Sequence, residues 1–271
     1  MGLTGFATGA VLALLQPLQE PPTAQPLWTI RNDDCQSVDA DGDPWRECGF
    51  QSYDMNADGS RVLTQSSLGS VQLWDGAGRQ IAKIDWGDEP GGASGFPNGV
   101  VRIVGTLGVA VVHQNQLLVL ELADGREIAR RVLPLLQIRE LRVTPNGALL
   151  ATAYYKDWKL GGVEIGLPGG EIRPATLAEA EGPDASMPWP GGLHIIRAEG
   201  AVLLRSAAER TIARLPPAAG ICAWQGLRAG SCRITRDGRK LLIAVPVPLG
   251  GDSGQDMRAD VTLYALPDAG D

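Results

Sequence analysis

The sequence lacks most of the patterns that mark enzymes and nucleic-acid binders. It has only two histidines, no Cys-x-x-Cys pair, no P-loop and no Gly-x-Ser-x-Gly, which gives no indication of multi-histidine metal centres, zinc ribbons or serine-hydrolase elbows. Bases do not outnumber acids either, since the net charge is −7 and the pI is about 5.0. A general nucleic-acid binder is therefore excluded as a partner class, because such a protein needs a basic footprint.

Long hydrophobic runs are also missing, apart from the N-terminus. Positions 5–15 are apolar and uncharged, but a bilayer span needs about 20 such residues, so we expect no membrane span. The run is typical of the apolar core of a secretory signal, and Thr23-Ala24-Gln25 offers a small residue for cleavage. We predict that residues 1–24 are a signal peptide or a disordered arm. Residues 25–271 would then form one domain, periplasmic or secreted.

The four cysteines form two local pairs, Cys35 with Cys48 and Cys222 with Cys232. We expect both pairs to be disulfides in an oxidising compartment, each contributing about 2–4 kcal/mol of stability. The alternative is that the protein is cytosolic and that all four are buried or free thiols.

Internal repetition is the strongest pattern that is present. Three segments share a strand, a tight turn and a second strand, and their turns are Asp58-Gly59, Asn146-Gly147 and Asp237-Gly238. These dipeptides supply the positive φ that a tight hairpin needs. The turns are 88 and 91 residues apart, and halving these gaps gives a repeating unit of about 44 residues.

Four short antiparallel strands in a unit of this length are typical of a β-propeller blade. The stretch from Asn56 to Asp85, with its Asp-Gly turn and a Leu-Trp-Asp strand end, resembles a WD40 or related quinoprotein-like repeat. We therefore predict an all-β fold, a propeller of five four-stranded antiparallel blades. The blades begin near Phe50, Gly95, Ile138, Trp189 and Cys232.

Three parts of this prediction have alternatives or further consequences. Six or seven blades would result if residues 176–230 contain more strands, and a β-sandwich or irregular barrel is the rival fold. The strand at residues 27–31 is expected to complete the last blade and to close the ring, which removes exposed sheet edges.

In a propeller, the turns between first and second strands and between third and fourth strands share one face. The connections between second and third strands and between blades share the other, which we call the long-loop face. Its long segments are 33–48, 87–96, 156–161, 176–190, 217–230 and 248–258. They carry 14 acids and five bases, a difference of −9, so this face accounts for the acidity of the whole chain.

Long loops on a rigid scaffold usually carry function, and aromatic side chains within a charged rim suit protein recognition. We predict a non-catalytic module that binds a protein partner, particularly a basic one, through the long-loop face. The expected binding residues are Asp88, Glu89, Tyr155, Trp158, Asp184, Trp189, Asp252, Asp256 and Arg258.

Other interpretations remain open. The acidic loops could serve solubility alone while the tryptophans pack between blades. A propeller-type enzyme is the second candidate function, either a hydrolase with paired carboxylates or a quinone-dependent dehydrogenase. Binding of a small ligand or carbohydrate between blades ranks last.

The segment Asp39-Ala-Asp41-Gly-Asp43 resembles a calcium-binding loop, because alternate carboxylates can converge on a hard cation. Cys48 stands where an EF-hand needs a bidentate glutamate, so an ordinary Asp-Gly turn is the alternative. Apart from calcium at this segment, no cofactor is expected.

Overall fold

The computed structural model describes the following parts of the chain: residues 20–33, 35–40, 43–85, 100–112, 115–181, 192–198, 200–223, 232–248 and 257–267. Regular structure in these ranges is almost entirely β-strand, which confirms the all-β prediction. The exceptions are helix α1 (Leu177–Ala180) and the 3-10 helix η2 (Pro217–Ala223).

The strands form four sheets, and the largest, of nine strands, consists of two antiparallel groups joined by a short parallel pairing of residues 257–259 with 47–49. We therefore distinguish five antiparallel groups, which we call units 1 to 5. Unit 1 contains β3 (Asp43–Met55), β4 (Arg61–Ser66), β5 (Val71–Asp75) and β6 (Gln80–Ile84). Unit 2 contains β7 (Val100–Val104), β8 (Leu107–Val112), β9 (Gln116–Glu121) and β10 (Glu127–Val132). Unit 3 contains β11 (Gln137–Val143), β12 (Leu149–Tyr154), β13 (Leu160–Gly166) and β14 (Glu171–Ala175). Unit 4 contains β15 (His194–Ala198), β16 (Ala201–Arg205) and β17 (Thr211–Leu215). Unit 5 contains β18 (Cys232–Ile234), β19 (Lys240–Pro248), β20 (Met257–Ala265) and the N-terminal β1 (Gln25–Ile30).

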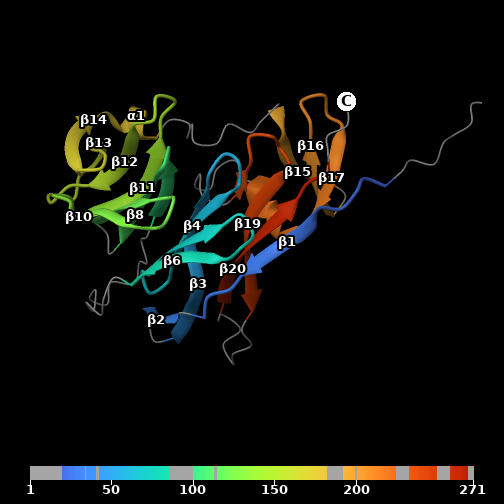
Figure 1. Cartoon of the computed structure of the whole chain (residues 1–271), viewed down its shortest axis with the longest axis horizontal. Helices are drawn as coiled ribbons and strands as arrows, with labels where there is room; N and C mark the ends of the chain where they lie inside the picture. Colours follow the sequence, from blue (N-terminus) through green and yellow to red (C-terminus); the bar gives the residue numbers. More distant parts are fainter. Residues whose placement is uncertain are drawn as a thin grey trace, which may run out of the picture.

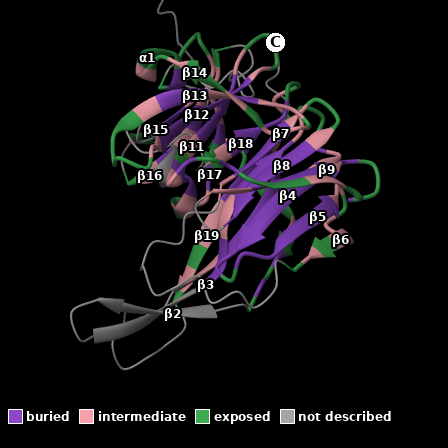
Figure 2. Cartoon of the chain, turned by 90° about the vertical axis from the view of Figure 1, so that its left-hand side faces the viewer, coloured by how far each residue is buried: buried purple, intermediate pink, exposed green. Residues whose placement is uncertain are grey.

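The middle strands of units 1 and 2 are buried on both faces of their sheets, because neighbouring units pack face to face. Strands β4, β8 and β9 are accordingly apolar or neutral over most of their length, whereas the outer strands β6 and β10 are half-buried or exposed (Figure 2). This gradient explains why the inner sequence runs show less polar alternation than the outer ones.

The three repeated turns have the conformation that the sequence predicts. Gly59, Gly147 and Gly238 have φ values of 69°, 80° and 71°, in the left-handed region that favours glycine. At each turn the glycine N–H donates to the carbonyl three residues earlier, for example to Asn56 at 2.9 Å.

Four clusters of buried apolar side chains hold the units together, and each crosses a boundary between units. They join unit 1 to unit 2, unit 2 to unit 3, unit 5 to unit 1, and unit 4 to unit 5. Figure 1 shows the resulting arrangement, with units 2 and 3 at one end, unit 4 at the other and unit 1 between them. Among the described residues, no buried cluster joins unit 3 to unit 4.

The N-terminal strand belongs to the last unit, as the sequence predicts. β1 runs antiparallel to β20, with Gln25 opposite Ala265 and Ile30 opposite Val261. The residues just before β1 reach unit 4, where the Arg214 N–H donates to the Pro22 carbonyl at 2.8 Å and the Ala24 N–H donates to the Arg214 carbonyl at 2.9 Å. The folded part of the chain therefore begins before residue 25.

Candidate functional site

The structure describes only some of the predicted site residues. Of the expected binding residues, Tyr155, Trp158 and Arg258 lie in described ranges. The others lie outside them: Asp88, Glu89, Asp184, Trp189, Asp252 and Asp256.

For the predicted calcium segment, the structure describes only the backbone on either side of the turn. Asp39 and Asp43 belong to β2 (Cys35–Ala40) and β3, Ala40 lies opposite Asp43, and Asp41 is outside the described residues. Within the described ranges, no group of three or more His, Cys, Asp or Glu side chains is placed to hold a metal ion.

One segment predicted to be a long loop, 33–48, is largely strand, so this detail of the prediction is wrong. Residues 35–40 and 43–48 form an antiparallel hairpin. In the segment 248–258, β19 and β20 pair as far as Pro248 and Met257, and residues 249–256 lie outside the described residues. The start of β20 also runs parallel to β3, with Arg258 opposite Cys48 and Ala259 opposite Gly49. This pairing satisfies backbone N–H and C=O groups, and the sequence alone does not show which distant strand supplies their partners.

Gly49 is essential to this parallel pairing. Its φ is 84°, and a Cβ added there would overlap the backbone of Ala259. Only glycine combines this backbone conformation with so close an approach of a second strand. Glycine at position 49 thus couples the hairpin of β2 and β3 to unit 5.

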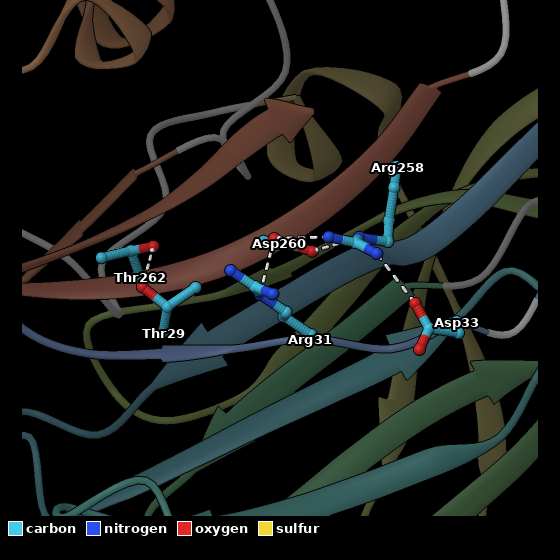
Figure 3. A network of polar contacts seen from close by, with 6 residues as sticks. All are labelled: Thr29, Arg31, Asp33, Arg258, Asp260 and Thr262. Atoms are coloured by element: carbon cyan, nitrogen blue, oxygen red, sulfur yellow. Dashed lines mark hydrogen bonds and ion pairs between the residues drawn. The ribbon is translucent and has the colours of Figure 1, made fainter. Parts of the chain in front are cut away.

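Arg258 is held by carboxylates of the chain itself (Figure 3). Its Nε and Nη2 donate to the buried Asp260 carboxylate at 2.7 and 3.2 Å, and its Nη1 donates to Asp33 Oδ1 at 2.8 Å. The hydrogen bond to Asp260 raises the pKa of Arg258 above its ordinary value. Arg31 Nε lies 3.6 Å from the same Asp260 carboxylate. Arg258 therefore attaches the segment after β1 to unit 5, and a role in binding remains a prediction.

A buried ion pair lies where units 5, 1 and 2 meet. Arg233 Nε on β18 donates to Asp54 Oδ1 on β3 at 2.5 Å, and both side chains are almost fully buried. Asp54 also accepts from the backbone N–H groups of Met55 at 2.9 Å and Ile103 on β7 at 2.7 Å. One carboxylate thus links three units, a role that sequence reasoning missed.

Tyr53 adds a second polar link at the same junction. Its hydroxyl accepts from the Ala244 N–H on β19 at 3.0 Å. Burial raises the pKa of Tyr53 to about 12, against a partial lowering by that hydrogen bond. The sequence offered one signal for this junction, because Asp54 and Arg233 precede the repeated turn segments at equivalent positions.

Three units use the same five-residue turn between their second and third strands, at residues 66–70, 155–159 and 206–210. In each turn the first N–H donates to the fifth carbonyl and the fourth N–H donates to the first carbonyl, at 2.9 to 3.0 Å. The fourth residue is left-handed in every case, with φ values of 86° at Gly69, 62° at Trp158 and 59° at Glu209. The backbone is thus the same while the side chain at this position differs.

Trp158 is displayed by its turn, with 69% of its surface exposed. The centroid of the indole ring lies 6.1 Å from the centroid of the Tyr154 ring. The Arg139 guanidinium lies over the same Tyr154 ring, 5.7 Å from its centroid. The Arg139 Nη1 is 3.5 Å from the Tyr154 hydroxyl, so the three side chains form a row on the surface of unit 3. Tyr154 and Arg139 were not among the predicted residues.

Tyr155, the other predicted aromatic residue, packs against its own unit. Its hydroxyl donates to the Gly162 carbonyl at 3.3 Å, and a Cβ added at Gly161 would lie 2.6 Å from its ring. Glycine at position 161 therefore allows the Tyr155 ring to lie against β13. Tyr155 stabilises the base of the turn while Trp158 points outward.

Exposed apolar side chains collect on the long-loop face. The described ranges contain five large apolar residues that are exposed, and four of them lie at connections of this face: Leu68, Val132, Trp158 and Leu160. The fifth, Leu27, lies on the outer strand β1. Four of the five exposed large apolar side chains among the described residues therefore lie at connections that the predicted propeller assigns to the long-loop face.

The sequence matches no protein-family model and no curated protein. Among solved structures, the chain is similar to the β-propeller domain of Cps50 (Swd1) from Myceliophteria thermophila, at 12% identity and a TM-score of 0.36 over 85% of this chain and 74% of that one. It is also similar to BamB from Moraxella catarrhalis, at 13% identity and a TM-score of 0.33 over 83% and 64% of the two chains.

A third similar structure is KlHsv2 with loop 6CD replaced by a Gly-Ser linker, at 12% identity and a TM-score of 0.32. The match covers 72% of this chain and 59% of that one, so the chain spans less than two thirds of this protein and of BamB. With TM-scores between 0.32 and 0.36, these similarities support no conclusion about this chain. The four-stranded antiparallel meanders of units 1, 2 and 3 agree with the four-stranded blades that the sequence predicts.

No helix in the described part of the chain is both long and apolar enough to cross a membrane.

Proposed function

We propose that this chain is an exported, non-catalytic β-propeller that binds a protein partner through its long-loop face. The observation that carries the proposal is that four of the five exposed large apolar side chains in the described ranges lie at the connections of that face, and Trp158 is the aromatic one of the four. Aromatic anchors of this kind dominate the energetics of protein interfaces.

The proposal includes five blades, one for each unit, with β1 supplying the outer strand of the last blade. Closure of the ring requires unit 3 and unit 4 to meet. Small-angle X-ray scattering on the purified chain tests this, because a closed ring is more compact than an open crescent of the same units. A radius of gyration above that of a compact domain of 271 residues would contradict closure.

The first functional experiment is affinity capture of the tagged protein from its native envelope at low and high salt. We expect a stoichiometric partner whose binding weakens as salt rises, because the long-loop face is acidic by sequence and the partner is expected to be basic. The variants Asp88→Lys and Asp184→Lys should weaken capture further. Asp124→Lys, in the tight turn between β9 and β10 on the opposite face, is the matched control.

Unchanged capture by the Asp88 and Asp184 variants would contradict an acidic contact surface. Recovery of the chain with no partner would favour the second candidate function, a propeller-type enzyme with paired carboxylates or a quinone cofactor, and a substrate screen would follow.

Export is part of the proposal and has its own test. The sequence places the cleavage site at Thr23-Ala24-Gln25, but Pro22 and Ala24 bond to β17, so we propose instead that processing occurs before Pro22 and that the mature protein keeps these contacts. The intact mass of protein purified from the envelope fraction reveals the first residue. Full-length protein in the cytoplasmic fraction would contradict export.

Disulfide formation belongs to the same proposal. Cys35 lies opposite Cys48 in the register of β2 and β3, and no described cysteine is a free thiol. We propose the pairs Cys35–Cys48 and Cys222–Cys232. Alkylation of the denatured protein should add no label before reduction and four labels after it. Labelling without reductant would contradict the pairing.

Calcium binding at the segment from Asp39 to Asp43 is the only cofactor proposal. Calorimetric titration with calcium chloride, compared with the Asp41→Asn variant, tests it. Equal heats for the two proteins would identify the segment as an ordinary turn.

A further inference from the structure

Trp158 occupies a position at which the chain otherwise uses glycine or an internally paired side chain. Gly69 holds the same left-handed position in unit 1, at no steric cost. Glu209 holds it in unit 4, where its carboxylate lies 3.2 Å from Arg205 Nη1 and 3.5 Å from His194 Nε2. A large side chain in this conformation is strained, so each non-glycine residue calls for an explanation.

The left-handed conformation of Glu209 is accompanied by ion pairs with Arg205 and His194 of the same unit, whereas Trp158 makes no ion pair and is largely exposed. The contact of Trp158 with Tyr154 leaves most of the indole in solvent. The turn therefore combines backbone strain with exposure of the largest apolar side chain, two features that both oppose folding stability. Their combination at one residue indicates a role outside the folded chain.

The surroundings of Trp158 indicate the chemistry of what binds there. Trp, Tyr and Arg are the residue types enriched at binding hot spots, and the row Trp158, Tyr154 and Arg139 consists of these three. Arg139 lies over the Tyr154 ring, so a ligand that contacts the row meets two side chains that already pack together.

The local charge is opposite to that of the long-loop face as a whole. The turn carries Lys156, Asp157 and Lys159, and Arg139 adds a further positive charge beside it. Lys159 Nζ lies 2.9 Å from Asp157, and this contact lowers the pKa of Asp157 and raises that of Lys159, so both stay charged near neutral pH. The turn and Arg139 together thus carry a net positive charge inside a face that is acidic by sequence.

We infer that Trp158 is the anchor of a peptide-binding site on unit 3. Its occupant is a partner segment in which an apolar side chain, seated on Trp158 and Tyr154, is flanked by carboxylates that face Arg139 and Lys156. This inference rests on the proposed protein-binding function and adds to it an acidic contact segment within a partner that is otherwise expected to be basic.

The test uses the full chain and a phage-displayed library of random 12-residue peptides. Selected peptides should carry net negative charge and at least one large apolar residue. Fluorescein-labelled synthetic copies are then titrated by fluorescence anisotropy against wild type, Trp158→Gly, Arg139→Glu and Glu209→Gly. We expect Trp158→Gly to weaken binding at least about tenfold, and Arg139→Glu by about fivefold.

Glu209→Gly is the matched control, because it makes the same change at the same turn position of another unit. It should leave peptide affinity within about twofold of wild type. Since glycine is preferred at position 158, Trp158→Gly should unfold at a temperature no lower than wild type, so a loss of binding cannot be assigned to misfolding.

Selection of basic peptides, or equal affinity of wild type and Trp158→Gly, would overturn the inference. Co-sedimentation with phosphatidylglycerol vesicles that depends on Trp158, without peptide binding, would overturn it in favour of a lipid contact. If Trp158→Gly still captures the envelope partner while Asp88→Lys does not, the proposed function stands and only this site fails.

Discussion

Two regions of the molecule differ in which side chains they bury. One is the junction of units 5, 1 and 2, and the other is the turn at residues 155–159. At the junction, the charged Asp54 and Arg233 are buried and satisfy each other across sequence-distant strands. At the turn, the apolar Trp158 is left in solvent on a strained backbone. At the junction, two charged groups lose their hydration and in return link the units. At the turn, the strained backbone and the exposed indole lower the stability of the fold but leave an apolar surface accessible to a partner. Structural and recognition roles are thus separated in space.

The largest effect is expected from breaking the junction. Asp54→Asn should lower the free energy of unfolding by about 3–5 kcal/mol, because it leaves the Arg233 charge buried without a carboxylate. Urea unfolding measured by circular dichroism tests this. Asp124→Asn, at an exposed turn, is the control and should change stability by less than about 0.5 kcal/mol. Similar midpoints for the two variants would remove the special role of Asp54.

The next effect concerns the segment that joins units 4 and 5. Ala24 is buried in their shared cluster, whereas Leu27 on the same segment is exposed. Ala24→Asp should cost about 2–3 kcal/mol, limited by local release of the segment. Leu27→Asp should be nearly neutral. Equal destabilisation in thermal unfolding would show that Ala24 is not packed in solution as it is in the structure.

A smaller change of opposite sign is expected at the turn. Trp158→Gly should raise the free energy of unfolding by about 1 kcal/mol, because glycine relieves the left-handed strain. Glu209→Gly gains the same relief but loses its ion pairs with Arg205 and His194, so its net change should be close to zero. Differential scanning calorimetry compares the two. Destabilisation by Trp158→Gly would mean that the indole packs against the protein in solution.

The smallest effect is a pH dependence of the junction. The pKa of Tyr53 is raised from 10.0 to about 12 in the folded state, so its contribution to stability is complete below pH 10 and is lost as pH rises through about 12. Between about pH 9 and 10.5 wild type should lose roughly 1 kcal/mol more than Tyr53→Phe. Urea unfolding at the two pH values measures the difference. Equal losses of unfolding free energy in wild type and Tyr53→Phe would indicate that Tyr53 is more hydrated than the structure shows.

Local features of the fold were predictable from the sequence, and long-range ones were not. Asp58-Gly59 and Asp237-Gly238 specify their turns through residues next to each other, and the outcome matches. The pairing of β20 with β3 joins segments about 200 residues apart, and no local pattern encodes such a contact. The start of β20 and the end of the predicted loop at 33–48 were therefore assigned without the partner strand that each of them has.

The candidate site shows the same division. Trp158 was identified as a binding residue from its position in a connection between strands. Its left-handed backbone was not, because Lys-Asp-Trp lacks the glycine that normally marks that conformation. The row with Tyr154 and Arg139 depends on the register of β11 and β12, which places Gln137 opposite Tyr154. Register is fixed by packing of whole strands, so it is beyond the reach of a motif.

The pairing of β1 with β20 has a consequence for biosynthesis. Gln25 and Ala265 are 240 residues apart, so β1 has no partner strand until β20 has been synthesised. For a secreted chain, this last zipping step would occur only after translocation is complete. Until then the outer edge of β20 is an open strand edge that can recruit a foreign one. The interval between emergence of β20 and docking of β1 is therefore the stage at which a holding chaperone would protect the protein most.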